Sequence, residues 1–175
     1  HGEEFFDHGG FEHNTTLYDE LLRVPLLVKI PGVSPRRLDA QVQLVDLYPT
    51  LARMAGVVPP AGLHGADITP ILQHSADDEQ YAFAEIVGSR FALRTTRWKY
   101  ISSLDGEILL FDLRADPRER RNVRAAHPEE VVRLERILAR MVGMAVTSGK
   151  KIQGQFAPIG PAVLNRLRAL GYVAN

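Results

Sequence analysis

Several features that many proteins carry are missing from this chain of 175 residues, and each absence excludes a kind of site or partner. There is no cysteine, which excludes disulfides, thiolate metal sites and a cysteine nucleophile within these residues. No apolar run approaches the length of a membrane span. Basic and acidic residues number 21 each, so no excess of one charge indicates a nucleic-acid partner or a membrane-surface patch.

The composition that remains is typical of a globular protein, with 45% apolar and 24% charged residues. The chain begins on a histidine and not on methionine, so we expect it to be a piece of something longer. Its first residues combine three histidines with four carboxylates, namely His1, His8, His13, Glu3, Glu4, Asp7 and Glu12. Imidazole and carboxylate are ligands of divalent metals. Taken alone, the cluster fits solvated loop histidines equally well.

The first half of the chain predicts short helices around one buried strand. Residues 1–14 are rich in glycine and predict a loop, and Thr16 is the expected N-cap of a helix over 17–22. The nearly continuous apolar run at 26–30 predicts a strand buried on both faces. Asp46 is the expected cap of a second helix, which Gly56 ends. A long connection over 57–75, with one helical turn near 68–72, separates this half from the next.

The second half predicts an antiparallel sheet with one packed helix. Aromatic and β-branched residues mark four strands, at 81–86, 90–95, 98–103 and 108–113. Asp105-Gly106 predicts the hairpin turn between the last two strands. A helix over 129–142 presents an apolar stripe of Val131, Leu134, Leu138 and Met141. Pro161 begins a final helix that ends at Gly171. Several antiparallel strands with one packed helix predict a small α+β layer arrangement for this part of the chain.

An ordered series of motifs resembles the sulfatase family of the alkaline-phosphatase superfamily. The series begins with His1-Gly2-Glu3-Glu4 and Asp7-His8-Gly9, continues with Thr16-Leu17-Tyr18-Asp19-Glu20 and Arg23-Val24-Pro25-Leu26, and includes Asp46-Leu47-Tyr48-Pro49-Thr50-Leu51. It ends with Arg97-Trp98-Lys99-Tyr100-Ile101, Leu110-Phe111-Asp112-Leu113, Asp116-Pro117-Arg118-Glu119 and Leu167-Arg168-Ala169-Leu170-Gly171-Tyr172. The resemblance covers nearly the whole chain apart from 143–160, and several ordered motifs are more specific than any one of them.

The resemblance implies roles for three residues near the N-terminus. His1 matches the second residue of the family's Asp-His metal-binding pair, which implies a metal ligand. His13 matches the Lys or His that contacts the sulfate group and acts on the leaving oxygen, and Asn14 beside it would bind substrate. The implied cofactor is a divalent metal, Ca²⁺ first, or Mn²⁺ or Zn²⁺ in a phosphonate or phosphate hydrolase. The implied partner is a small anionic ester substrate.

The chain also departs from the family pattern. The family's nucleophile is a formylglycine made from a Cys/Ser-x-Pro-x-Arg motif, and paired N-terminal aspartates complete its metal site, but this sequence contains neither. We expect them in an N-terminal part that this chain lacks, and we expect the chain alone to hydrolyse nothing. The compartment stays open, with a periplasmic or secreted location suggested by the family.

The resemblance implies an organisation in three parts. Residues 1–75 would hold the last strand and helices of an alkaline-phosphatase-like α/β domain, 76–145 the small antiparallel sheet with its helix, and 146–175 an extension with a short helix. Two alternatives to sulfate ester hydrolysis remain open: phosphonate or phosphate ester hydrolysis in the same superfamily, and a non-catalytic interaction module. Exposed apolar faces at 26–30 would favour self-association over a well-behaved module.

Other candidate residues have mainly structural interpretations. His8 with Asp7 is expected to serve loop structure more than the mouth of a substrate site. Lys99 is expected to extend along the sheet edge with its ammonium in water. Asp112, Asp116 and Glu119 could form an acidic metal site, but carboxylates around an Asp-Pro turn more commonly bond backbone groups. Aromatic residues at strand spacing, Trp98, Tyr100 and Phe111, are expected in the core.

Overall fold

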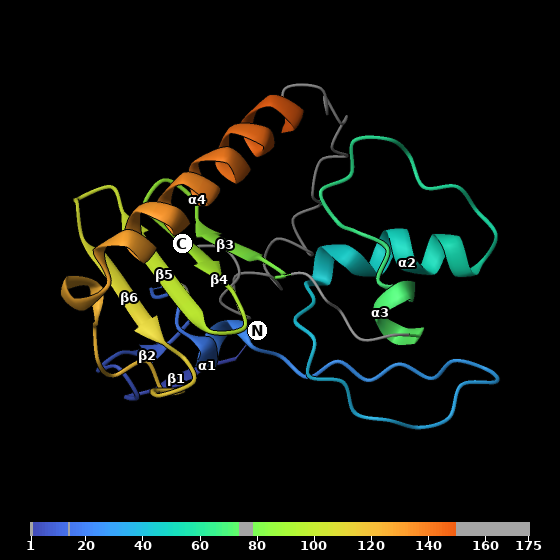
Figure 1. Cartoon of the computed structure of the whole chain (residues 1–175), viewed down its shortest axis with the longest axis horizontal. Helices are drawn as coiled ribbons and strands as arrows, with labels where there is room; N and C mark the ends of the chain where they lie inside the picture. The colour runs from blue at the N-terminus through green and yellow to red at the C-terminus, as the bar shows by residue number, and fades with distance from the viewer. Residues whose placement is uncertain (1, 14, 74–78, 150–175) are drawn as a thin grey trace, which may run out of the picture. The chain divides into compact units, whose positions relative to one another are not determined.

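The computed structural model in Figure 1 describes residues 2–13, 15–73 and 79–149. The chain divides into two units, His1–Ala145 and Val146–Asn175. The final helix expected from Pro161 lies outside the described residues. Within the described residues, no helix is both long enough and apolar enough to cross a membrane.

A four-stranded antiparallel sheet forms the centre of the first unit. Its strands run in sequence order as β3 (Ala82–Ile86), β4 (Arg90–Arg94), β5 (Trp98–Ser103) and β6 (Ile108–Asp112). Each strand lies within one residue of its expected bounds, so this prediction is confirmed. Gly106, with φ of 91°, occupies the turn between β5 and β6, a backbone conformation that glycine adopts without steric cost.

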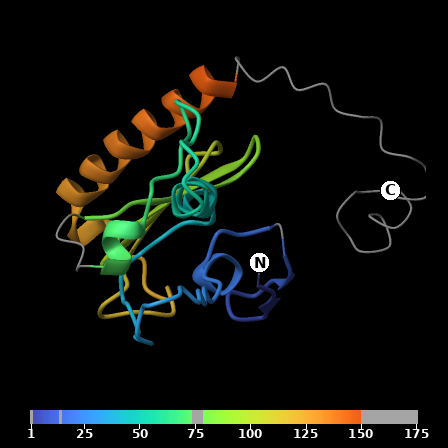
Figure 2. The same ribbon diagram turned by 90° about the vertical axis from the view of Figure 1, so that its right-hand side faces the viewer.

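Both faces of this sheet are buried, and different segments cover them. Neighbouring strand residues point to opposite faces. One face carries Leu93, Trp98, Tyr100 and Leu110, which pack with Leu134 and Leu138 of α4 (Pro128–Gly149). The other face carries Ala92, Ile101 and Phe111, which pack with Leu17 and Leu113. The helix and the N-terminal segment therefore lie on opposite sides of the sheet, as Figure 2 shows. The expected core aromatics and helix stripe are confirmed.

The segment that covers the second face contains a hairpin and a single helical turn. Two short antiparallel strands, β1 (Glu4–Phe5) and β2 (Phe11–Glu12), occur where a loop was expected. Helix α1 covers Asp19–Leu22, and its N-cap is Tyr18 without a side-chain cap. The expected Thr16 cap is therefore wrong, because the Thr16 hydroxyl donates instead to Glu4 at 3.1 Å.

The middle of the chain contains the expected second helix, but the Asp46 side chain does not cap it. Helix α2 covers Leu47–Met54, after a 3₁₀ turn η1 at Leu44–Asp46, and α3 covers Thr69–Gln73. Gly56 follows α2 with φ of 74°, as expected of a residue that ends a helix. The Asp46 carboxylate does not cap α2. It accepts hydrogen bonds from the backbone N–H of Gln43 and Ala66, so the chain folds back onto η1.

The strand expected at 26–30 is wrong. These residues form neither helix nor strand, and the Leu27 side chain is 89% exposed. An apolar run becomes a strand only where a neighbour completes its hydrogen bonds, and the described part of the chain supplies no such neighbour here. We call residues 22–63 the apolar arm, since it exposes Leu22, Leu26, Leu27, Val28, Val33, Leu38, Leu44, Val45, Tyr48, Leu51, Met54, Val57, Val58 and Leu63.

Candidate active site

His13 follows β2 directly, and a carboxylate from the same hairpin segment holds its ring. Nδ1 of His13 lies 3.0 Å and 3.1 Å from the two carboxylate oxygens of Glu3. The His13 side chain is 21% exposed and that of Glu3 39%, so the pair remains accessible from solvent. A carboxylate at one ring nitrogen fixes the orientation of an imidazole, which is the arrangement that acid–base catalysis requires.

The two other expected site residues, His1 and Asn14, lie outside the described residues. The residue next to His1 is described, and it is held tightly. The backbone N–H of Gly2 donates to the Leu21 carbonyl oxygen of α1 at 3.0 Å. A Cβ atom at position 2 would lie 1.8 Å from the Glu20 carbonyl oxygen, so only glycine fits this approach. Helix α1 therefore sets the path of the chain beside Glu3.

His8 serves the structure of the loop, in agreement with its expected role. Its Nδ1 lies 2.5 Å from the Glu20 carboxylate and its Nε2 lies 3.1 Å from the Glu119 carbonyl oxygen. The ring stacks on Tyr18 with the ring centroids 3.6 Å apart. Burial alone would lower the pKa of His8, but the hydrogen bond and charge of Glu20 outweigh it and raise the pKa above its ordinary value. Both ring nitrogens are thus engaged in joining distant segments.

Glu4 is the buried centre of the hairpin, and sequence analysis gave it no role beyond the cluster. Its carboxylate accepts the backbone N–H groups of His8 and Gly10 and the Thr16 hydroxyl, at 3.1–3.2 Å. Among the described residues, Glu4, His8 and Glu20 are the one group whose ligand atoms lie close enough to share a metal ion, within 4.8 Å of one another. Those atoms already take part in hydrogen bonds that hold the hairpin to α1, so the group fits a structural role better than a cation site.

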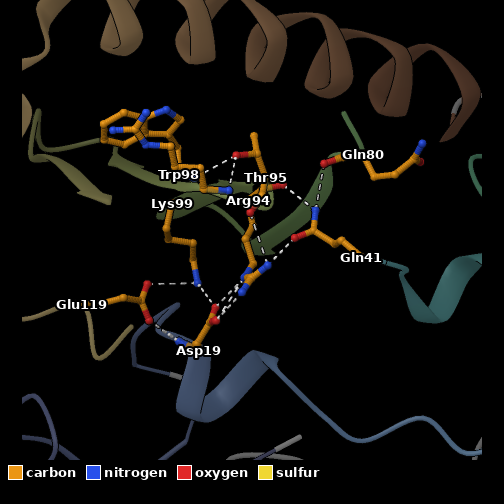
Figure 3. A network of polar contacts seen from close by, with 9 residues as sticks. Asp19, Gln41, Gln80, Arg94, Thr95, Trp98, Lys99 and Glu119 are labelled. Carbon is orange, nitrogen blue, oxygen red and sulfur yellow. Dashed lines mark hydrogen bonds and ion pairs between the residues drawn. The ribbon is translucent and has the colours of Figure 1, made fainter. Parts of the chain in front are cut away.

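A buried network of charges joins α1 to β4, β5 and the segment after β6 (Figure 3). Lys99 of β5 is fully buried, and its Nζ lies 2.8 Å from Asp19 Oδ1 and 3.3 Å from Glu119 Oε1. Arg94 of β4 also pairs with Asp19, at 3.0 Å. The expectation that the Lys99 ammonium lies in water is therefore wrong. Lys99 shares the sheet face of Ile101, and the N-terminal segment covers that face.

The two carboxylates of this network differ in their pKa shifts. Burial would raise the pKa of Asp19, but the charges and hydrogen bonds of Lys99 and Arg94 lower it below the ordinary value. Burial raises the pKa of Glu119, and the charge of Lys99 offsets this only in part. Lys99 Nζ forms an ion pair with Glu119 Oε1 at 3.3 Å, and this buried oxygen accepts no hydrogen bond within the described structure. Asp19 is therefore the better-compensated anion of the two.

The acidic cluster after β6 does not form a shared metal site. Asp112 pairs with Arg97 at 2.8 Å, Asp116 accepts the backbone N–H of Arg121 at 2.7 Å, and Glu119 points to Lys99. The three carboxylates thus have three separate partners, two of them basic side chains. The interpretation of Asp116 as a turn residue that bonds backbone is confirmed, and the metal interpretation of the cluster is not supported.

The chain is similar to known proteins in its sequence and in its fold. Residues 6–143 match the family described as N-sulphoglucosamine sulphohydrolase, C-terminal. Arylsulfatase K of Gallus gallus is 36% identical over 159 residues, covering 81% of this chain and 30% of that protein. Arylsulfatase K of Xenopus laevis is 32% identical over 160 residues, with the same two shares.

A solved structure of a 2-O GAG sulfatase shows the same fold, with a TM-score of 0.61 at 24% identity. The match covers 90% of this chain and 37% of that chain. The chain therefore spans 30–37% of the length of these proteins.

Proposed function

Because this chain belongs to the sulfatase family, through the C-terminal portion of that family, we propose that the intact protein hydrolyses sulfate esters. The family assignment confirms the resemblance predicted from the ordered motifs. One observation supports the proposal most directly. His13, at the position expected to contact the sulfate group, has its imidazole held by the Glu3 carboxylate on the segment that begins beside His1.

His13 would act on the leaving oxygen of the ester. Cleavage of a sulfate ester develops negative charge on that oxygen, and a positioned imidazolium stabilises the charge and donates a proton to it. Glu3 would keep the ring in the productive orientation through Nδ1. Asn14, next in sequence, would bind the substrate beside it. These roles for His13 and Asn14 are part of the proposal.

The proposal also includes a divalent cation, Ca²⁺ in a sulfatase and Mn²⁺ or Zn²⁺ in a phosphonate or phosphate hydrolase. The described residues do not make a site for it, since the Glu4, His8 and Glu20 atoms are occupied by hydrogen bonds. We propose His1 as one ligand, with the paired aspartates and the formylglycine nucleophile supplied by sequence outside this chain. It follows that the 175-residue chain alone is inactive.

The first test concerns the chain by itself. The purified 175-residue chain is incubated with an aryl sulfate or an aryl phosphate ester in Ca²⁺ or Mn²⁺. We expect no turnover of either ester above the buffer rate. Turnover would contradict the proposed need for groups outside the chain. A monomer that unfolds in one cooperative step and shows no activity in any longer form would instead favour the interaction module.

The second test uses the longer protein that contains this segment. We expect it to hydrolyse an aryl sulfate faster than the matched aryl phosphonate. His13→Ala should lower kcat for the sulfate by about 10²–10⁴-fold, the usual contribution of a general acid. His64→Ala is the matched control, because His64 is an exposed histidine directly after the apolar arm. Equal kcat for the two variants would refute the role of His13, and faster phosphonate turnover would favour the alternative hydrolase.

A further inference from the structure

The buried charge network connects two segments that are far apart in the sequence. Asp19 is held through both its side chain and its backbone. Lys99 Nζ lies 2.8 Å from the Asp19 carboxylate, and the Asp19 backbone N–H donates to Glu119 Oε2 at 2.6 Å. Figure 3 shows these contacts converging on the start of α1. Lys99 and Glu119 are 0% and 1% exposed, so water does not screen the pair.

Stability alone does not account for such a cluster. Burying three charged side chains carries a large desolvation cost, and apolar residues of similar volume commonly stabilise a core as well or better. What a charged, hydrogen-bonded cluster supplies is a defined geometry. Contacts at both the carboxylate and the N–H of Asp19 fix where α1 lies and how it is rotated about its own axis.

From α1, a series of hydrogen bonds leads to the proposed catalytic histidine. The Leu21 carbonyl oxygen of α1 binds the N–H of Gly2, and the next residue, Glu3, binds the His13 ring. A second route begins at the Glu119 carbonyl oxygen, which lies 3.1 Å from His8 Nε2. The backbone N–H of His8 in turn donates to the Glu4 carboxylate in the hairpin. Glu119 therefore contacts the N-terminal segment at two places, at Asp19 through its carboxylate and at His8 through its backbone carbonyl.

We propose that Glu119 and Lys99 are positioning residues of the active site, which act through Asp19 and His8 to hold Glu3 and His13 in place. This inference rests on the proposed function, since it concerns the same site. Neither residue touches the substrate. Because the network sets the placement of a reacting group and not the binding of the ester, its loss should lower kcat and leave KM nearly unchanged.

The kinetic test uses the longer protein with an aryl sulfate as substrate. Glu119→Ala removes both side-chain contacts, and we expect kcat to fall about tenfold or more, with KM within about twofold of the parent. Glu119→Gln keeps an oxygen that can accept the Asp19 N–H, and should recover part of kcat. Glu79→Ala is the matched control, since Glu79 is also ion-paired, but to Arg133 of α4, which covers the opposite face of the sheet.

A spectroscopic test separates this inference from the proposed function. In the 175-residue chain with ¹⁵N-labelled histidine, Glu119→Ala should shift the ring signals of His8 and His13, and Glu79→Ala should leave both in place. If Glu119→Ala does not fold, Glu119→Gln gives the same comparison with a smaller shift. An absence of sulfatase activity together with shifted His13 signals would refute the function and keep the positioning role. Unshifted His13 signals, or a kcat loss no greater than that of Glu79→Ala, would overturn the inference.

Discussion

The four-stranded sheet with α4 and the apolar arm, residues 22–63, are both rich in apolar residues but bury them very differently. In the sheet region Leu93, Leu110 and Leu134 are completely inaccessible to solvent. In the arm Leu27 is 89% exposed and Val58 83%. The residue types are similar, so composition does not explain the contrast.

The difference lies in the partners available to each region. Every strand from β3 to β6 has a sequence neighbour that completes its hydrogen bonds, and α4 and the N-terminal segment cover the two faces. The run at 26–30 has no such neighbour among the described residues. Burial of an apolar segment therefore depends on its neighbours in the fold and not on its own sequence. Matched substitutions in the two regions should therefore differ most where the side chain of the sheet region is fully buried.

The same substitution of a lysine should have very different costs in the two regions. Lys99→Met leaves Asp19 and Glu119 buried without their shared cation, and should lower the free energy of unfolding by about 3–5 kcal/mol. Lys29→Met, at an exposed position of the arm, should change it by less than about 0.5 kcal/mol. Urea unfolding of both variants measures the difference. Similar losses of unfolding free energy in the two variants would show that Asp19 and Glu119 do not depend on the Lys99 ammonium.

Leucine truncation provides the apolar version of the same comparison. Leu134→Ala removes a fully buried side chain from the core under α4, and should cost about 2–5 kcal/mol in unfolding free energy. Leu27→Ala should cost less than about 0.5 kcal/mol, because the side chain already contacts water. Urea unfolding at low protein concentration measures both. A large cost for Leu27→Ala that appears only at high concentration would show that the arm is buried by self-association.

The contact between the N-terminal segment and the sheet region should weaken with rising pH. The pKa of His8 is raised in the folded chain, so protonation of His8 favours folding. This contribution is complete below the unfolded pKa of about 6.5 and is lost as pH rises through the higher folded value. Unfolding free energies at several pH values from 6 to 9 should therefore decline. The decline should be shallower in His8→Gln, and an equal slope in both proteins would contradict the assignment.

The smallest effect is expected for an ion pair at the edge of the sheet region. Glu79 pairs with Arg133 of α4 at 2.8 Å, and both side chains are more than one-third exposed. Glu79→Gln should lower the unfolding free energy by about 0.2–1 kcal/mol, because solvent screens such pairs. The loss should shrink in 1 M salt. The corresponding pair of the arm, Arg37 with Asp39, is almost fully exposed, and Asp39→Asn should leave thermal unfolding unchanged.

Sequence reasoning succeeded where the determining interactions are local. The strand bounds and the stripe of α4 follow from alternation and helical spacing, and the β5–β6 turn follows from Asp105-Gly106. It failed at 26–30, where an apolar run was taken as evidence of burial. It also failed at Thr16, whose hydroxyl binds Glu4 twelve residues earlier in preference to the end of the adjacent helix.

The candidate site divides in the same way. His13 was predicted as a site residue from its residue type and its place in an ordered series of motifs, and that role stays a prediction. Glu3 as its partner, and Glu4 as the buried acceptor of the hairpin, carried no distinguishing signal, since several carboxylates occupy the same short stretch. Lys99 was misassigned because alternation with Trp98 and Tyr100 shows only that it faces the other side of the sheet.

The amino-acid sequence by itself determined the antiparallel sheet, its covering helix and the family to which the chain belongs, because strand alternation, helical spacing and turn conformations act over a few residues. Only the tertiary structure decided that Lys99 and Glu119 meet Asp19, across separations of 80 and 100 residues. Charges pair according to distance in space, and that distance is fixed when the N-terminal segment packs on the second face of the sheet.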